Sequence, residues 1–289
     1  MKKQDLVDAI RRSGGRRWPL EEVGDFWPRL ELLQNTGRYG DLLASITAAN
    51  DKNNFLALVL ETNFAYQFEA AGRKLAYEIK QDTREGSSID FLRRTPENKR
   101  VFFEIRLLQQ RQSIADFINS QLEKYGIYQI LFAGEDEREE VIRLQNTVLS
   151  KVQDKRGNPI KFFSTDADVV NIVVIDATQS ILGAFDIFDC MLVAYGDPSV
   201  EEVYRRQVFG LFQNDQPQYP QAIHDLAAKF AHMRNTLHGV LFLFKKPGGE
   251  LIAYQLEEYL MWNHAKIDQA NAGPILADIS AVIPVRADE

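Results

Sequence analysis

The clearest pattern of apolar positions lies between residues 55 and 71. Apolar side chains recur there every four residues, at Leu56, Leu60, Phe64 and Phe68. This spacing places them on one face of an α-helix, so the run predicts a long amphipathic helix that ends at Gly72. The polar stretch 50–54, which is rich in asparagine and aspartate, supplies the residue types preferred at a helix N-cap. We expect this helix to bury one face against the core.

Three segments after this helix have the composition of short β-strands. Residues 74–80 alternate apolar Leu75, Tyr77 and Ile79 with less apolar neighbours, which is the period of two that a strand requires. Residues 88–93 and 101–108 are two further strand candidates. The sequence 95–99 between them contains a proline and reads as a turn. Together these two strands predict a β-hairpin.

The rest of the chain alternates between helical and strand-like patterns. Helices are predicted at 113–125, 135–152, 200–212, 220–233 and 250–262, and strands at 127–133, 169–175 and 239–245. Residues 185–195 fit neither pattern clearly. Such alternation favours an α/β fold with a mixed β-sheet flanked by helices. We expect a helical N-terminal segment over 1–50, an α/β domain over 51–270 and a C-terminal tail over 271–289.

Composition and charge narrow the functional classes. The chain has 289 residues and is 45% hydrophobic, which is ordinary for a globular protein. Its net charge of −7 argues against a protein whose whole surface binds nucleic acid. Basic residues outnumber acidic ones locally, by ten to six, between residues 73 and 111. A lone Cys190 and the lack of a long apolar run predict a cytoplasmic protein that does not bind a membrane.

Charged residues converge on the predicted hairpin. In the strand 101–108, a period of two puts Glu104 and Arg106 on one face, and folding the hairpin brings Asp90 opposite them. Two adjacent carboxylates repel each other unless they share a proton or a cation. Mg²⁺ is a hard cation that carboxylate oxygens coordinate, so it suits such a pair. Glu61 can reach the same place from the long helix. The alternative is a plain cross-strand ion pair, worth under about 1 kcal/mol.

This order of elements resembles the PD-(D/E)XK nuclease superfamily. In that family a helix with an acidic residue precedes a strand and then a hairpin, which carries Pro-Asp on its first strand and Glu-X-Lys on its second. The resemblance covers about residues 55–133, with Glu61 on the helix, Ile89-Asp90 on the first hairpin strand and Glu104-Ile105-Arg106 on the second. It implies a restriction-endonuclease-like core, and the region 136–234 then exceeds the minimal core as a large insertion or extension.

Two positions depart from the family pattern. Ile89 replaces the proline, which shapes the strand and has no chemical role. Arg106 replaces the lysine that helps to position the attacking water, and arginine is bulkier and is not deprotonated in proteins. Lys74, Lys80 and Gln109 are candidates to substitute for that lysine.

The resemblance implies a metal-dependent nuclease that hydrolyses phosphodiesters of DNA, as an endo- or exodeoxyribonuclease. Glu61, Asp90, Glu104 and the backbone carbonyl of Ile105 would hold Mg²⁺ or Mn²⁺, and Arg106 would contact the scissile phosphate. The alternative is an inactive protein of the same fold that binds nucleic acid or a protein partner.

Partner surfaces are predicted in two places. Contacts to DNA are predicted at Arg93, Arg94 and Arg100, for which an ordinary solvated surface is the other interpretation. The region 136–234 is expected to supply a dimer contact or the surface for a protein partner.

Overall fold

The computed structural model describes residues 1–14, 21–80, 88–108, 134–162, 166–178, 186–197 and 208–287 of the chain. The described helices are α1 (Lys3–Gly14), α2 (Val23–Thr36), α3 (Gly40–Ala48), α4 (Lys52–Ala70), α6 (Gly134–Val152), α7 (Ile187–Tyr195), α8 (Gln221–Thr236) and α9 (Gln269–Ser280). The described strands are β1 (Leu75–Lys80), β2 (Ser88–Arg94), β3 (Arg100–Leu107), β4 (Val169–Asp176), β5 (Gly239–Lys245) and β6 (Leu256–Trp262).

These six strands form one mixed sheet, which confirms the predicted α/β class. Their order in the sheet follows their order in the chain. The pairs β1–β2, β2–β3 and β5–β6 are antiparallel, whereas β3–β4 and β4–β5 are parallel. β2 and β3 are the predicted hairpin, and its turn is closed by a 2.9 Å hydrogen bond from the N–H of Asn98 to the carbonyl of Thr95. The parallel pairs require crossovers, which α6 provides after β3 and α7 and α8 provide after β4.

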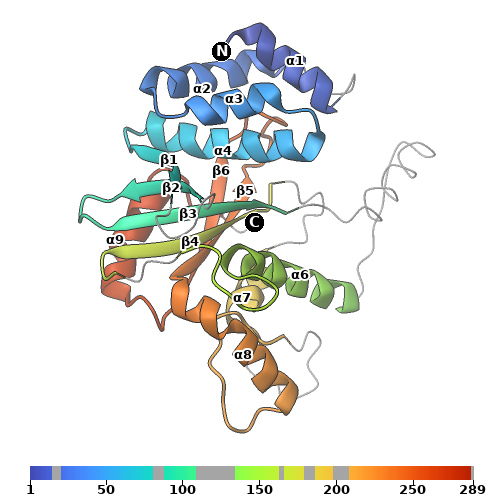
Figure 1. Ribbon diagram of the computed structural model, residues 1–289, viewed down its shortest axis with the longest axis vertical. Helices are drawn as coiled ribbons and strands as arrows, with labels where there is room; N and C mark the ends of the chain where they lie inside the picture. Colours follow the sequence, from blue (N-terminus) through green and yellow to red (C-terminus); the bar gives the residue numbers. More distant parts are fainter. Residues whose placement is uncertain are drawn as a thin grey trace, which may run out of the picture.

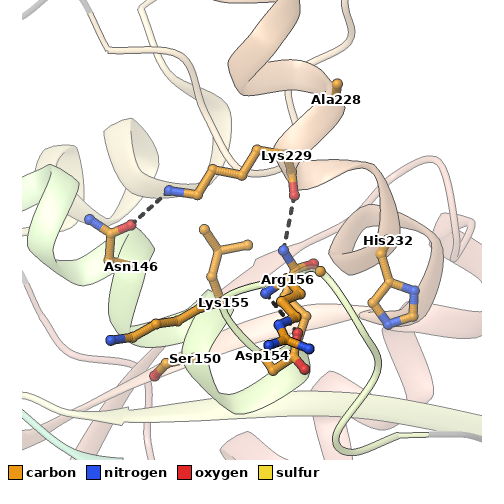
Figure 2. A pocket seen from close by; sticks show the side chains of 11 residues that line it. Asn146, Ser150, Asp154, Lys155, Arg156, Ala228, Lys229 and His232 are labelled. Atoms are coloured by element: carbon orange, nitrogen blue, oxygen red, sulfur yellow. Dashed lines mark hydrogen bonds between the residues drawn. The ribbon is translucent and has the colours of Figure 1, made fainter.

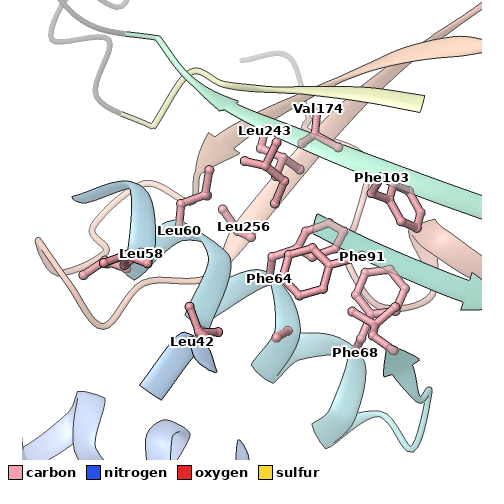
Figure 3. Packing of buried hydrophobic residues seen from close by; sticks show 14 of the residues in the cluster. Leu42, Leu58, Leu60, Phe64, Phe68, Phe91, Phe103, Val174, Leu243 and Leu256 are labelled. Carbon is pink, nitrogen blue, oxygen red and sulfur yellow. The ribbon is translucent and has the colours of Figure 1, made fainter. Parts of the chain in front are cut away.

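One face of the sheet is covered by α4, and α1, α2 and α3 pack on the outer side of that helix (Figure 1). α4 begins after its N-cap Asp51, whose carboxylate accepts the N–H of Asn54 at 2.8 Å. Its central Phe64 packs on the hairpin, with ring centroids 5.2 Å from Phe91 and 5.4 Å from Phe103 (Figure 3). Full burial of such a side chain contributes about 1.5–3 kcal/mol. This contact fixes α4 over β2 and β3.

The opposite face of the sheet is covered by α6, α7 and α8 (Figure 1). Between the two layers β4 is buried along its whole length, as predicted for a strand covered on both faces. Its alternate residues divide between the two cores, with Val174 in the cluster beneath α4 and Val173 in the cluster beneath α6 to α8.

Several predictions beyond the hairpin need correction. Residues 250–262 were expected to form a helix, but β6 occupies 256–262 because pairing with β5 outweighs the helical propensity of its glutamates. Residues 208–212, the described end of another predicted helix, are irregular. Residues 185–195, which fitted neither pattern, contain α7. The helix predicted at 113–125 and the strand predicted at 127–133 lie outside the described residues.

The two ends of the described chain carry helices. The cluster beneath α4 includes Leu6 and Ile10 of α1, so the helical N-terminal segment shares a hydrophobic core with the sheet. The segment predicted as a C-terminal tail contains most of α9, whose N-cap Asp268 accepts the N–H of Asn271 at 2.8 Å. Within the described part of the chain, no helix is both long enough and apolar enough to cross a membrane.

Candidate functional site

Strands β2 and β3 separate at the point where the sequence places its candidate acids. Their register runs from Arg94 opposite Arg100 to Phe91 opposite Phe103 and ends there. Ile89 is buried in the cluster beneath α6, whereas Phe91, two residues later, is buried in the cluster beneath α4. Residues two apart on a regular strand share a face, so β2 turns over between them. The intervening residue is Asp90.

In this opening the side chain of Asp90 replaces a backbone carbonyl of β2 as the hydrogen-bond acceptor for β3. Its Oδ2 accepts the backbone N–H of Ile105 on β3 at 2.6 Å. Burial, and then the negative charge of Glu104, raise the pKa of Asp90 to about 6, although the charges of Lys151 and Lys161 and the bond from Ile105 oppose this shift. The structure therefore brings the two predicted carboxylates close together on adjacent antiparallel strands.

Glu104 is fully buried on β3 and is bound by two cations. Its Oε1 accepts hydrogen bonds from the amines of Lys151 and Lys161, whose side chains are 18% and 21% exposed. Its Oε2 is buried and has no hydrogen-bond partner among the described residues. A buried carboxylate loses much of its hydration, and paired amines offset that cost. The unpartnered oxygen leaves one coordination position on this carboxylate.

Glu61 approaches the same cluster from α4. Its Oε2 accepts a 2.9 Å hydrogen bond from the hydroxyl of Tyr77 on β1. Burial is the main cause that raises the pKa of Glu61 to about 8, and the charges of Asp90 and Glu78 add to it. The raised pKa favours the protonated form of Glu61, which relieves repulsion among the acids.

Glu78 marks the edge of the site on β1. Its φ of 53° is a left-handed conformation that residues with a Cβ seldom adopt. The ladder pairs Tyr77 with Phe91 and Ile79 with Ile89 and skips Glu78, so both strands depart from regular geometry beside Asp90. Backbone strain of this kind is concentrated at functional sites.

The two lysines are positioned by the end of α6 and by the segment that follows it. Lys151 lies in the last turn of α6, and a short turn then returns the chain so that Gln153 and Pro159 form a β-bridge. Lys161 follows that bridge. The next residue, Phe162, has a φ of 60° and is buried in the cluster beneath α6. Its anchored ring holds the chain at Lys161 in place.

Sequence reasoning missed both lysines, although one left a signal. Lys151 lies seven residues after Leu144 and three after Val148, two buried residues of α6, so it falls on the apolar stripe of the helix. A cation on such a stripe, in a helix that covers a sheet, needs a buried acid. We find no comparable signal for Lys161, which is 57 residues from Glu104 and reaches it through the fold alone.

Arg106 does not join the group of acids. It is exposed on β3 and forms no ion pair with a described carboxylate, so it is not the cation that neutralises Glu104. Among the proposed substitutes, Lys74 and Lys80 form no ion pair with Glu61, Asp90 or Glu104 within the described chain. Gln109 lies outside the described residues.

Two of the three arginines predicted to contact DNA are bound to carboxylates. Arg93 donates to both oxygens of Asp278 on α9. Arg100 pairs with Asp166 and Asp168, next to the start of β4. These pairs give both arginines a structural role, while Arg94 is exposed. The excess of positive charge seen in the sequence is thus partly neutralised in three dimensions.

The residues fit a bound metal ion only in part. No group of three or more acidic, histidine or cysteine side chains in the described chain is arranged to hold one. Mg²⁺ is however commonly held by one or two carboxylates, together with water and substrate phosphate. Asp90 and the unpartnered Oε2 of Glu104 match that smaller set.

No protein-family model matches this sequence, and the comparisons with curated proteins and with solved structures found no match.

Proposed function

We propose that this chain is a metal-assisted phosphodiesterase of the PD-(D/E)XK type that acts on DNA, with Lys151 and Lys161 in the role of the motif lysine. One observation carries this proposal: both lysine amines converge on Glu104 beside Asp90, at the opening of the hairpin. The resemblance expects a lysine two residues after this glutamate, where Arg106 stands instead. Two lysines from α6 and its following turn supply that charge from another part of the chain.

The chemistry follows from the groups that meet at the opening. A bound Mg²⁺ or Mn²⁺, held by Asp90 and Glu104, would polarise a phosphate oxygen and lower the pKa of a bound water. The hydrogen bond from Ile105 fixes the orientation of Asp90. Each lysine amine carries three donors, so donors remain beyond those used on Glu104 for a phosphate oxygen or for water. Their positive charge would stabilise the negative charge that develops during hydrolysis.

A second candidate function is a catalytically inactive protein of this fold that binds nucleic acid or a protein partner. The observation in its favour is that two cations already bind Glu104, because such a buried ion triad can serve structure alone. The two functions differ in whether Asp90 is needed for a chemical step.

Cleavage assays separate these two functions. Purified protein with Mn²⁺ or Mg²⁺ is incubated with single-stranded DNA, duplex DNA and RNA, and the double variant Asp90→Asn, Glu104→Gln serves as the control for contaminating nuclease. The proposal expects cleavage of DNA by the wild type at least about 100-fold faster than by the control, the order of loss when a key electrostatic group is removed. Equal rates for both proteins would reject the enzyme and leave the binding function.

Metal binding can be measured without activity. An ion that binds only the native state stabilises it, so Mn²⁺ should raise the melting temperature of the wild type. The single variant Asp90→Asn should lose most of that shift, whereas Arg106→Ala should keep it. An equal shift in wild type and Asp90→Asn would place the ion elsewhere.

A further inference from the structure

A pocket of about 660 Å³ lies beside the end of α6. Its wall is formed by the last turns of α6, by the turn after that helix and by one face of α8 (Figure 2). The lining includes Ser150, Asp154, Lys155, Arg156, Lys229 and His232.

The charge of this pocket is positive. Lys155, Arg156 and Lys229 bring three cations to it, and all three residues are exposed. The one acidic residue of the lining, Asp154, directs its carboxylate into its own turn, where it accepts the N–H groups of Arg156 and Asn158 at 2.8 and 2.9 Å. Three cations with so little opposing charge favour an anionic ligand.

The pocket is preorganised by hydrogen bonds between its walls. The side chain of Gln153 donates to the carbonyl of Lys229 at 3.2 Å, which ties α8 to the end of α6. The amine of Lys229 donates to the side-chain oxygen of Asn146 at 3.2 Å, across the pocket (Figure 2). The turn itself is held by Asp154 and by Gly157, whose φ of 81° favours glycine. An anion would meet walls that are already fixed relative to each other, with Lys229 held between them, which lowers the entropic cost of binding.

This pocket is continuous in the chain with the carboxylate and lysine site. Ser150 lines the pocket while the next residue, Lys151, binds Glu104, so the last turn of α6 separates the two. The turn with Lys155 and Arg156 begins shortly after Lys151 and leads back to Lys161, the second partner of Glu104. A strand of linked phosphates could therefore contact both places at once.

We infer that the pocket binds a backbone phosphate of nucleic acid, next to the phosphate that a metal ion at Asp90 and Glu104 would hold. This inference rests on the proposed function and names how that site would hold its substrate. Lys155, Arg156 and Lys229 contact the phosphate as charges, without reading the base. The pocket anchors the strand and takes no part in the chemical step.

The test is binding without cleavage. Association of a fluorescent single-stranded oligonucleotide is measured by fluorescence anisotropy in EDTA, across a range of salt concentrations. The wild type is compared with one triple variant, Lys155→Ala, Arg156→Ala, Lys229→Ala. Each lost phosphate contact lowers the slope of log K against log salt by about 0.7 for a single strand, so the triple variant, which loses the one phosphate contact of the pocket, should lose about 0.7. Affinity at low salt should fall at least about tenfold. The matched control is Lys52→Ala, Lys246→Ala, Lys266→Ala, which removes the same charge from exposed residues outside the pocket and should keep most of the slope.

The outcomes separate this inference from the proposed function. Equal losses in the two triple variants, or no salt-dependent binding by the wild type, would overturn the pocket, whatever the cleavage assay finds. Competition by polyglutamate as strong as by unlabelled oligonucleotide would overturn it too, since the pocket would then accept any polyanion. Binding that is weaker in the pocket triple variant than in the control triple variant would support the phosphate site. If the wild type also shows no metal-dependent cleavage, the enzyme is rejected while the phosphate site stands.

Discussion

Glu104 and Glu258 are both fully buried, and both lie on strands of the same sheet, yet their surroundings differ. Glu104 on β3 is bound by two lysine amines, whereas Glu258 on β6 accepts one 3.0 Å hydrogen bond from the hydroxyl of Ser280. Burial raises the pKa of Glu258 to about 7, so below that pH a bound proton removes the charge of this acid. Each has an Oε2 with no partner among the described residues. The comparison teaches that burial alone tends to neutralise a glutamate, and that cations must be supplied where a charged carboxylate is to be kept.

The largest expected effect comes from removing the cations of Glu104. The double variant Lys151→Met, Lys161→Met leaves a buried carboxylate unpaired, which should lower the free energy of unfolding by about 3–5 kcal/mol. Urea denaturation at pH 7 measures this. Adding Glu104→Gln to the double variant should recover a large part of the loss. If the double variant is as stable as the wild type, the two lysines do not offset the charge of Glu104.

Glu258→Gln should have the opposite effect and should depend on pH. The pKa of Glu258 is about 7 in the folded protein, above the ordinary value near 4.5, so the folded state binds this proton more tightly than the unfolded state. Its contribution is then fully present at low pH and is lost as the pH rises from about 4.5 through 7, at up to about 1.4 kcal/mol for each pH unit. Glutamine has no proton to lose, so the variant should exceed the wild type by under about 1 kcal/mol at pH 5 and by about 3 kcal/mol at pH 8. Thermal denaturation at both values checks the sign, and a variant less stable at pH 8 would contradict it.

A smaller effect is expected at Ser280. Its hydroxyl donates to Glu258 and favours the charged form of that acid. Ser280→Ala should therefore destabilise the protein by about 1 kcal/mol at pH 8 and by less at pH 5. The same melting experiments measure it, with Glu258→Gln, Ser280→Ala as the control in which the difference between the two pH values should disappear. A loss that is equal at both pH values would assign Ser280 a packing role only.

The elements of this fold that could be predicted from the sequence are those specified by short stretches of the chain. The repeat of four in α4, the turn at Thr95 and the apolar run of β4 each specify an element within a few residues. Residues 250–262 were expected to form a helix, which glutamates suit, and only pairing with β5 makes Glu258 a buried strand residue. Propensity gives way to tertiary pairing at such an edge.

The candidate site divides in the same way. Asp90 and Glu104 belong to one hairpin, so the sequence could place them together, and Glu61 is on the helix packed against it. The cations come from 47 and 57 residues beyond Glu104, after a crossover whose path no local pattern fixes. The sequence offered Arg106 as the nearest cation, but the fold leaves that residue exposed.

The most direct test of this account compares the cations by the rate of Mn²⁺-dependent cleavage of single-stranded DNA. Two variants are assayed beside the wild type: Lys151→Met with Lys161 intact, and Arg106→Ala. The account predicts that Lys151→Met lowers the rate at least about 100-fold, as expected for loss of a preorganised charge at the reacting phosphate, while Arg106→Ala stays within about threefold of the wild type. A large loss in Arg106→Ala with a small one in Lys151→Met would contradict it and return the role of the motif lysine to Arg106.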